Sequence, residues 1–89
     1  DLSLEELARA CAVEPQWIVE RIEAGILGDG SIQVTSYRFT SKDLTRTRRM
    51  RQLERDFDAM PELAALVADL IEEVDRLKGR IKIAGLTVD

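Results

Sequence analysis

The last third of the chain carries the feature that most restricts its possible folds, a regular spacing of apolar residues. Between residues 63 and 81, apolar side chains recur alternately every four and every three positions. This period of about 3.5 residues aligns them in a narrow stripe along one helix, which is typical of a coiled-coil seam. Leucines alternate with β-branched residues in the stripe, an arrangement that favours two strands. The seam residues are Leu63, Val67, Leu70, Val74, Leu77 and Ile81.

The length of this helix predicts a partner for the seam. At about 1.5 Å per residue, about twenty residues extend roughly 30 Å, which is more than a domain of this size can cover. The seam of a single copy would face water, so the pattern predicts a homodimer without indicating the direction of its two helices. The alternative is a helix that packs wholly on its own domain, since Leu66 and Ile71 widen the stripe. We predict a first domain at residues 1–60 and a dimerisation helix at residues 61–89.

Two short helices are predicted at the beginning of the chain. Ser3 and Glu6 have the spacing of a capping box and precede an apolar run that ends near Cys11. Pro15 is suited to the first position of a second helix, and Gly25 is suited to the position just after its end. Two short helices joined by so tight a turn indicate a helix-turn-helix.

The middle of the chain predicts a small wing followed by a third helix. The stretch "GDGSIQVTSYRF" (residues 28–39) combines turn-forming glycines with strand-forming residues and predicts a β-hairpin. Thr40 and Asp43 form a second capping box, which begins a helix that we expect to end at Phe57. The predicted fold class is therefore mainly α, with a small β-hairpin wing and a C-terminal coiled-coil helix. The predicted inner face of the third helix consists of Met50, Leu53 and Phe57.

The composition gives little support to catalysis. The chain has no histidine and a single cysteine, Cys11, so the usual general base and the usual zinc ligand are missing. We expect no enzyme activity, metal or cofactor. Cys11 cannot form a disulfide within the chain, which favours a reducing compartment such as the cytoplasm, and its apolar neighbours predict a core position. No apolar run approaches about 18 residues, so no membrane span is predicted.

The net charge of −4 conceals three blocks of opposite sign. Residues 1–30 carry seven acids and two bases, residues 31–55 carry two acids and seven bases, and residues 56–89 carry eight acids and four bases. This alternation predicts charge pairing within the chain or within a dimer. The expected pairs join Arg48, Arg51 and Arg55, with Arg46 and Arg49 nearby, to Asp69, Glu72, Glu73 and Asp75 of the last helix.

The order of these elements resembles the MerR-type winged-helix fold. The resemblance depends on "LSLEELARACAVEP", "EAGIL" and "YRFTSKDLTRTRRMRQL", which fall within residues 2–57. The chain is most similar to one offshoot, the chaperone-modulatory CbpM family, through the wing end Tyr37-Arg38-Phe39, "RRMRQLERDF" and "LAALVADLIEEVDRLKGRI". The resemblance implies a dimer that binds the J-domain of a DnaJ-like co-chaperone and limits its stimulation of Hsp70.

The second helix weighs against the usual alternative, a MerR-type regulator that binds DNA. Such regulators typically carry an Arg-Tyr-Tyr-like run where this chain has Val19, Glu20 and Arg21. A glutamate is repelled by phosphates, and among base edges it can accept a hydrogen bond only from the amino group of cytosine. The first 37 residues contain only two bases, too few for a protein that relies on neutralising phosphates. We therefore do not expect nucleic acid as a partner.

The outward face of the second helix is instead the predicted partner-binding surface. Trp17 and Arg21, at i and i+4, are placed to form a cation–π pair beside carboxylates, a combination suited to a protein interface. The resemblance implies a basic J-domain helix opposite this face. Two alternatives remain: a buried Trp17 beside merely solvated carboxylates, and a dimerisation module of another kind. The predicted contact residues are Gln16, Trp17, Glu20, Arg21 and Glu23.

Overall fold

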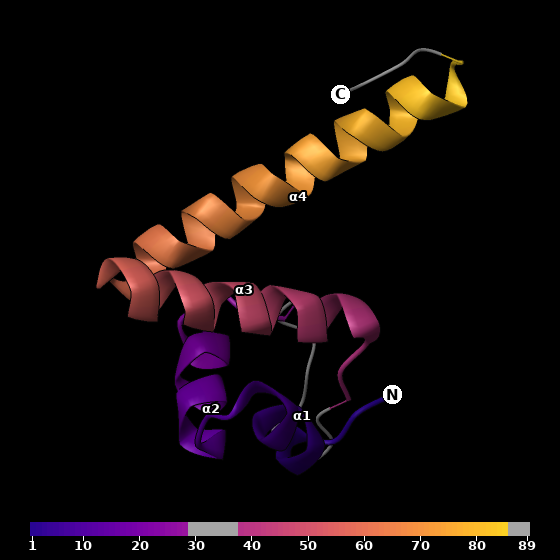
Figure 1. Cartoon of the computed structure of the whole chain (residues 1–89). Coiled ribbons are helices and arrows are strands. Elements are labelled where there is room, and N and C mark those ends of the chain that lie inside the picture. The colour runs from indigo at the N-terminus through magenta and orange to yellow at the C-terminus, as the bar shows by residue number, and fades with distance from the viewer. Residues whose placement is uncertain (29–37, 86–89) are drawn as a thin grey trace.

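Four helices make up the fold. The computed structural model describes residues 1–28 and 38–85. Its helices are α1 (Leu4–Cys11), α2 (Pro15–Glu23), α3 (Ser41–Phe57) and α4 (Pro61–Ile83). α1 and α2 lie on one side of α3, whereas α4 begins against α3 and then extends away from the rest of the molecule (Figure 1). The mainly α class is confirmed.

The predicted helix boundaries follow from local signals that the structure confirms. The Ser3 hydroxyl accepts from the Glu6 amide at 3.1 Å, and the Glu6 carboxylate accepts from the Ser3 amide at 2.8 Å. This backbone hydrogen bond favours the ionised carboxylate and lowers the pKa of Glu6. Thr40 and Asp43 form the same reciprocal cap at the start of α3. Gly25 follows α2 with a φ of 76°, a left-handed conformation that favours glycine.

The predicted wing falls mainly on residues 29–37, which lie outside the described residues. At the described end of this stretch, Phe39 pairs with Leu2 near the N-terminus in an isolated antiparallel bridge. Two backbone hydrogen bonds of 2.8 and 2.9 Å join them. The described residues contain no strand and so do not support a β-hairpin.

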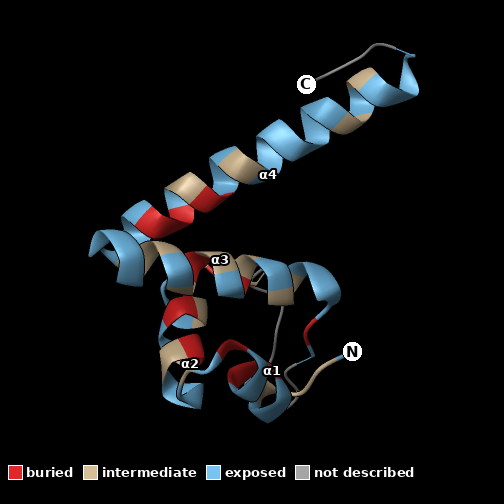
Figure 2. Ribbon diagram, in the orientation of Figure 1, coloured by how far each residue is buried: buried red, intermediate tan, exposed pale blue. Residues whose placement is uncertain are grey.

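The core lies where α1, α2 and α3 meet and includes the segments next to them. Leu7, Ile18, Phe39 and Met50 are fully buried in it, and Leu27 is almost so. Cys11 is also buried, as its apolar neighbours predicted, and loss of solvent raises the pKa of its thiol. The buried residues are concentrated where the helices cross, and α4 becomes exposed beyond α3 (Figure 2).

The first turns of α4 pack on α3 through small side chains. Ala64, Ala65 and Ala68 are buried, and the last two belong to the same core as the helix-turn-helix. Alanines at this contact let the two helix backbones approach closely. The predicted boundary between residues 60 and 61 therefore falls in the turn between α3 and α4, while the beginning of α4 packs into the first domain.

The opposite face of α4 carries the predicted seam, which the single chain leaves exposed. Leu63, Leu70, Val74 and Leu77 are between 44% and 58% exposed, and Val67 and Ile81 are partly covered. This burial pattern differs from that of a helix packed wholly on its own domain. Within the described ranges, no helix is both long and apolar enough to cross a membrane.

The inner face predicted for α3 is correct at Met50 and wrong at Phe57. Met50 is fully buried, whereas Phe57 is 74% exposed. The reason is that α3 extends past the part covered by α1 and α2, so its last turn has no layer to pack against (Figure 1). Met60, in the turn that follows, is 71% exposed. Both are therefore exposed apolar side chains near the start of α4.

Candidate functional site

The outward face of α2 is acidic, as its sequence predicted. Ile18 and Arg21 point into the molecule, so Gln16, Glu20 and Glu23 lie on the exposed side of the helix. The Glu20 side chain is 63% exposed. We define the acidic face as Gln16, Glu20 and Glu23.

Arg21 forms the centre of a cluster that joins α2 to α3. Its guanidinium lies 3.6 Å from the centroid of the Trp17 ring, which confirms the predicted cation–π pair. It also donates to both carboxylate oxygens of Glu54, at 3.0 and 2.6 Å, and to the Trp17 carbonyl at 2.9 Å. The Arg21 and Glu54 side chains are only 10% and 15% exposed. Such a two-pronged contact fixes the orientation of α2 on α3.

This cluster determines what α2 can present to a partner. Arg21 is the only basic residue in α2, and its charge is neutralised inside the molecule by Glu54. Trp17 is half-buried and packs against the core. Three of the five predicted contact residues are therefore exposed: Gln16, Glu20 and Glu23. Trp17 lies at the border of this group, and Arg21 is buried.

The basic side chains of α3 divide into two groups. Arg46 pairs with the α4 carboxylates Asp69 and Glu72, at 2.9 and 2.8 Å. The same pairing was expected for Arg48, Arg51 and Arg55, within the chain or within a dimer, and the described residues of the single chain do not form it. These three arginines lie about half a helical turn away from Arg46 and so point away from α4. We call these three residues the arginine edge.

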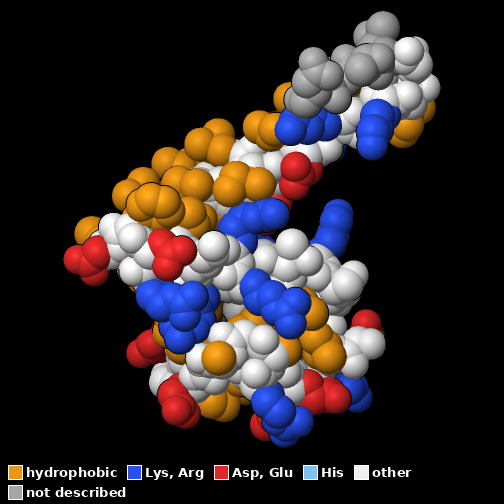
Figure 3. All heavy atoms as spheres, viewed as in Figure 1, with side chains coloured by type: hydrophobic (Ala, Val, Ile, Leu, Met, Phe, Trp, Pro, Cys, Tyr) orange, Lys and Arg blue, Asp and Glu red, His pale blue; other side chains and the backbone are white. Residues whose placement is uncertain are grey.

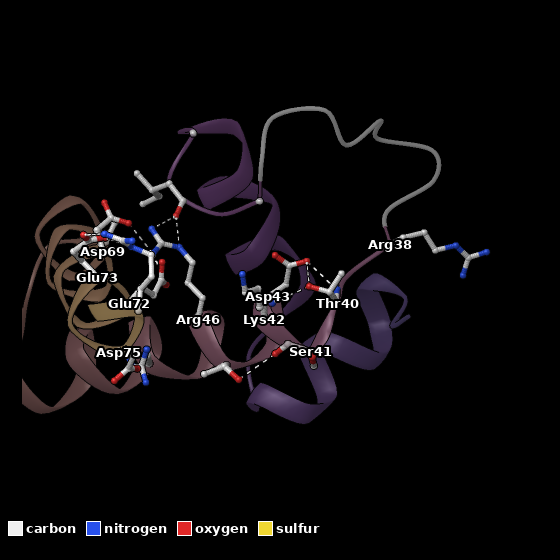
Figure 4. A pocket seen from close by; sticks show the side chains of 17 residues that line it. Arg38, Thr40, Ser41, Lys42, Asp43, Arg46, Asp69, Glu72, Glu73 and Asp75 are labelled. Carbon is white, nitrogen blue, oxygen red and sulfur yellow. Dashed lines mark hydrogen bonds and ion pairs between the residues drawn. The ribbon is translucent and has the colours of Figure 1, made fainter. Parts of the chain in front are cut away.

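Arg46 is the central ion-pairing residue of α3, whereas the sequence indicated it only as a neighbour of the arginine edge. Besides its two ion pairs, it donates from Nε and Nη2 to the Ile26 carbonyl, at 3.3 and 3.0 Å (Figure 4). Burial disfavours its charged form, but the hydrogen bond and charge of Glu72, helped by Asp69, outweigh this and raise the pKa of Arg46. One side chain thus holds the segment after α2, α3 and α4 together.

A second surface feature is the exposed apolar side of α4. Figure 3 shows apolar side chains gathered along α4 and over the turn from α3. The sequence pattern identified the six seam positions but missed the exposure of Phe57, which was expected on the inner face of α3. Apolar surfaces of this extent are characteristic of protein–protein contacts.

Two short helices set against a longer third helix define a helix-turn-helix domain, here continued by a projecting helix. Over residues 2–84 the sequence matches the family model described as MerR HTH family regulatory protein. The chain belongs to this family. No protein with a curated description and no solved structure gives a significant match.

Proposed function

We propose that this chain is a protein-binding member of the MerR family, close to the CbpM offshoot, and that α2 binds the J-domain of a DnaJ-like co-chaperone. By occupying the J-domain, the chain would limit stimulation of Hsp70. The observation that carries this proposal is the inward orientation of Arg21. With its only cation paired to Glu54, α2 presents carboxylates at its surface.

Electrostatics favour a basic polypeptide over a duplex at this face. Binding to DNA depends on cations that displace counterions from phosphates. In the acidic face, Glu20 and Glu23 would instead meet phosphates with like charge. The half-buried Trp17 beside them is a residue of the kind that anchors protein interfaces. A basic helix of the partner would therefore gain attraction at the carboxylates and apolar contact at the ring.

A second candidate is a DNA-binding regulator, and two observations favour it. The family match is to regulatory proteins with a helix-turn-helix, and the arginine edge supplies cations that α2 lacks. DNA would then be held mainly through α3 rather than through α2. Affinity for duplex DNA should in this case fall steeply with salt.

We also propose that the functional unit is a homodimer formed through the seam. Two copies would cover the apolar surface that each leaves exposed on α4. Charge along α4 favours antiparallel helices. Residues 61–75 carry five carboxylates and no base, whereas residues 76–83 carry four bases and no carboxylate. Antiparallel packing sets the acidic half of one helix beside the basic half of the other, whereas parallel packing would set like charges together.

The J-domain proposal predicts the effect of reversing charge on the acidic face. Glu20→Lys and Glu23→Lys should each weaken binding to a purified J-domain of a DnaJ-like protein by roughly tenfold, which is about 1.4 kcal/mol. The reason is that each replaces attraction to a basic helix by repulsion. Fluorescence anisotropy with a labelled J-domain would measure the dissociation constants.

Glu5→Lys provides a matched control, because Glu5 is also exposed but lies on α1. It should leave the affinity within about twofold. J-domain binding that is unaffected by both α2 reversals would place the contact elsewhere. Tight, strongly salt-dependent binding to duplex DNA in the absence of J-domain binding would favour the DNA-binding regulator.

The antiparallel arrangement predicts which engineered cysteines can form a disulfide. Leu63 and Ile81 lie near opposite ends of the seam. Under oxidation, a mixture of Leu63→Cys and Ile81→Cys proteins should yield mainly the mixed disulfide dimer, because a disulfide forms only across a short Cα separation. Mass spectrometry distinguishes the products. Predominant homodisulfides in the same mixture would demonstrate parallel helices.

A further inference from the structure

The arginine edge of α3 has charge that the chain itself does not neutralise. No carboxylate among the described residues lies within 4.0 Å of a side-chain nitrogen of Arg48 or Arg51. Arg55 has only its sequence neighbour Asp56, at 3.7 Å, and its side chain is 65% exposed. Arg48 and Arg51 lie close enough to Cys11 for their charge to act on its thiol, which places them beside the end of α1.

This edge also lies outside the contacts described above. α4 meets α3 on the side of Arg46, about half a helical turn away. The seam faces away from α3 altogether, since the buried alanines occupy the other side of α4. A dimer formed through the seam therefore leaves the arginine edge open. Figure 3 shows Lys and Arg side chains gathered along α3 above α1 and α2.

The spacing of the edge matches one kind of ligand. Arg48, Arg51 and Arg55 are separated by three and four positions, so they align along about 10 Å of one side of the helix. An acidic helix with carboxylates at i, i+3 and i+7 repeats this spacing. Each guanidinium can then donate two hydrogen bonds to one carboxylate.

The surroundings of the edge favour a polypeptide over a nucleic acid. Glu54, paired to Arg21, lies between Arg51 and Arg55 in the sequence, and the exposed Glu20 carboxylate lies 4.0 Å from the same guanidinium. Asp56 also adjoins Arg55. The carboxylates therefore lie at the Arg55 end of the edge, and Arg48 and Arg51 carry its least compensated charge. A row of phosphates that continued past Arg55 would meet these carboxylates with like charge, whereas an acidic helix of about two turns can end at Arg55.

We infer that the arginine edge is a second docking surface, which binds an acidic helical segment of a partner protein. This surface is independent of the acidic face of α2 and does not depend on the identity of the partner proposed there. Together, the two surfaces place opposite charges on α2 and α3. A partner with both signs of charge could engage α2 and α3 in only one orientation.

Two synthetic peptides test the inference. Both are labelled alanine-based helices of the same composition, one with glutamates at i, i+3 and i+7 and the other with the same glutamates distributed around the helix. The full chain should bind the aligned peptide at least about fivefold more tightly in an anisotropy titration at low salt. Reversing two charges, with Arg48→Glu and Arg51→Glu together, should weaken that binding by at least about tenfold.

Lys42→Glu is the matched control, since Lys42 is exposed on α3 but lines the groove toward α4. It should change the affinity for the aligned peptide by less than about twofold. The neutral pair Arg48→Gln and Arg51→Gln should also lose binding, which covers the case in which the reversed variant fails to fold. Equal affinity for both peptides, or no measurable binding, overturns the inference. The inference is also overturned if the chain binds duplex DNA more tightly than the aligned peptide and the same arginine variants lose that binding.

Discussion

Replacing Glu54 by alanine should lower the free energy of unfolding by about 3 kcal/mol, a large part of the total for a domain of this size. The substitution leaves the Arg21 guanidinium, whose side chain is only 10% exposed, without its carboxylate partner. A buried cation without a partner retains its desolvation cost and loses the attraction that offsets it. Thermal unfolding followed by circular dichroism should show a midpoint lower by roughly 15 °C.

Two further variants separate the ion pair from simple packing. Glu54→Gln keeps one acceptor oxygen for Arg21 and should cost less than Glu54→Ala. The double variant Arg21→Met and Glu54→Met removes both charges and keeps much of the volume, so it should be more stable than Glu54→Ala alone. Should Glu54→Ala unfold at the temperature of the unaltered chain, the pair would not hold α2 on α3.

A glutamate in place of Leu70 should convert the proposed homodimer into monomers and raise the dimer dissociation constant more than about 100-fold, or about 3 kcal/mol. Leu70 lies in the middle of the seam and is 58% exposed in the single chain. In a dimer it would be covered by apolar side chains, where a carboxylate has no partner. Sedimentation equilibrium over a range of concentrations measures the constant.

Ile83→Glu is the control for this experiment. Ile83 is also apolar and is 88% exposed, but it lies nearly half a helical turn around α4 from the seam. The same chemical change there should leave the dimer intact. Equal effects of both substitutions would point to general solubility rather than to the seam. A chain that is already monomeric at high concentration would remove the dimer from the proposal.

The elements that the sequence predicted well are those whose signals are local. Both capping boxes lie within four residues, and each forms as predicted because side chain and amide are neighbours whatever the rest of the fold does. The cation–π pair of Trp17 and Arg21 is similarly fixed by the helical repeat. The exposure of the seam follows from the spacing of its residues along α4. The buried alanines lie on the side of α4 that faces α3, so the leucines of the seam lie on the opposite side.

The contacts that the sequence did not reveal join residues far apart in the chain. Arg21 and Glu54 are 33 positions apart, and Arg46 reaches Ile26 across 20 positions. Neither contact follows a helical repeat. The charge blocks indicated that ion pairs form, but they did not identify Glu54 as the partner of Arg21 or the Ile26 carbonyl as an acceptor for Arg46. Phe57 was misplaced for a related reason: the helical repeat gives the direction of a side chain but not whether another helix covers it.

The anchoring of Arg46 has a mechanical consequence. The same guanidinium binds the backbone just after α2 and two carboxylates of α4. A tilt of α4 relative to α3 would have to break either the hydrogen bonds from Arg46 to Ile26 or its ion pairs with Asp69 and Glu72. A force that tilts the far end of α4 would therefore be transmitted through Arg46 to the backbone that follows the helix-turn-helix.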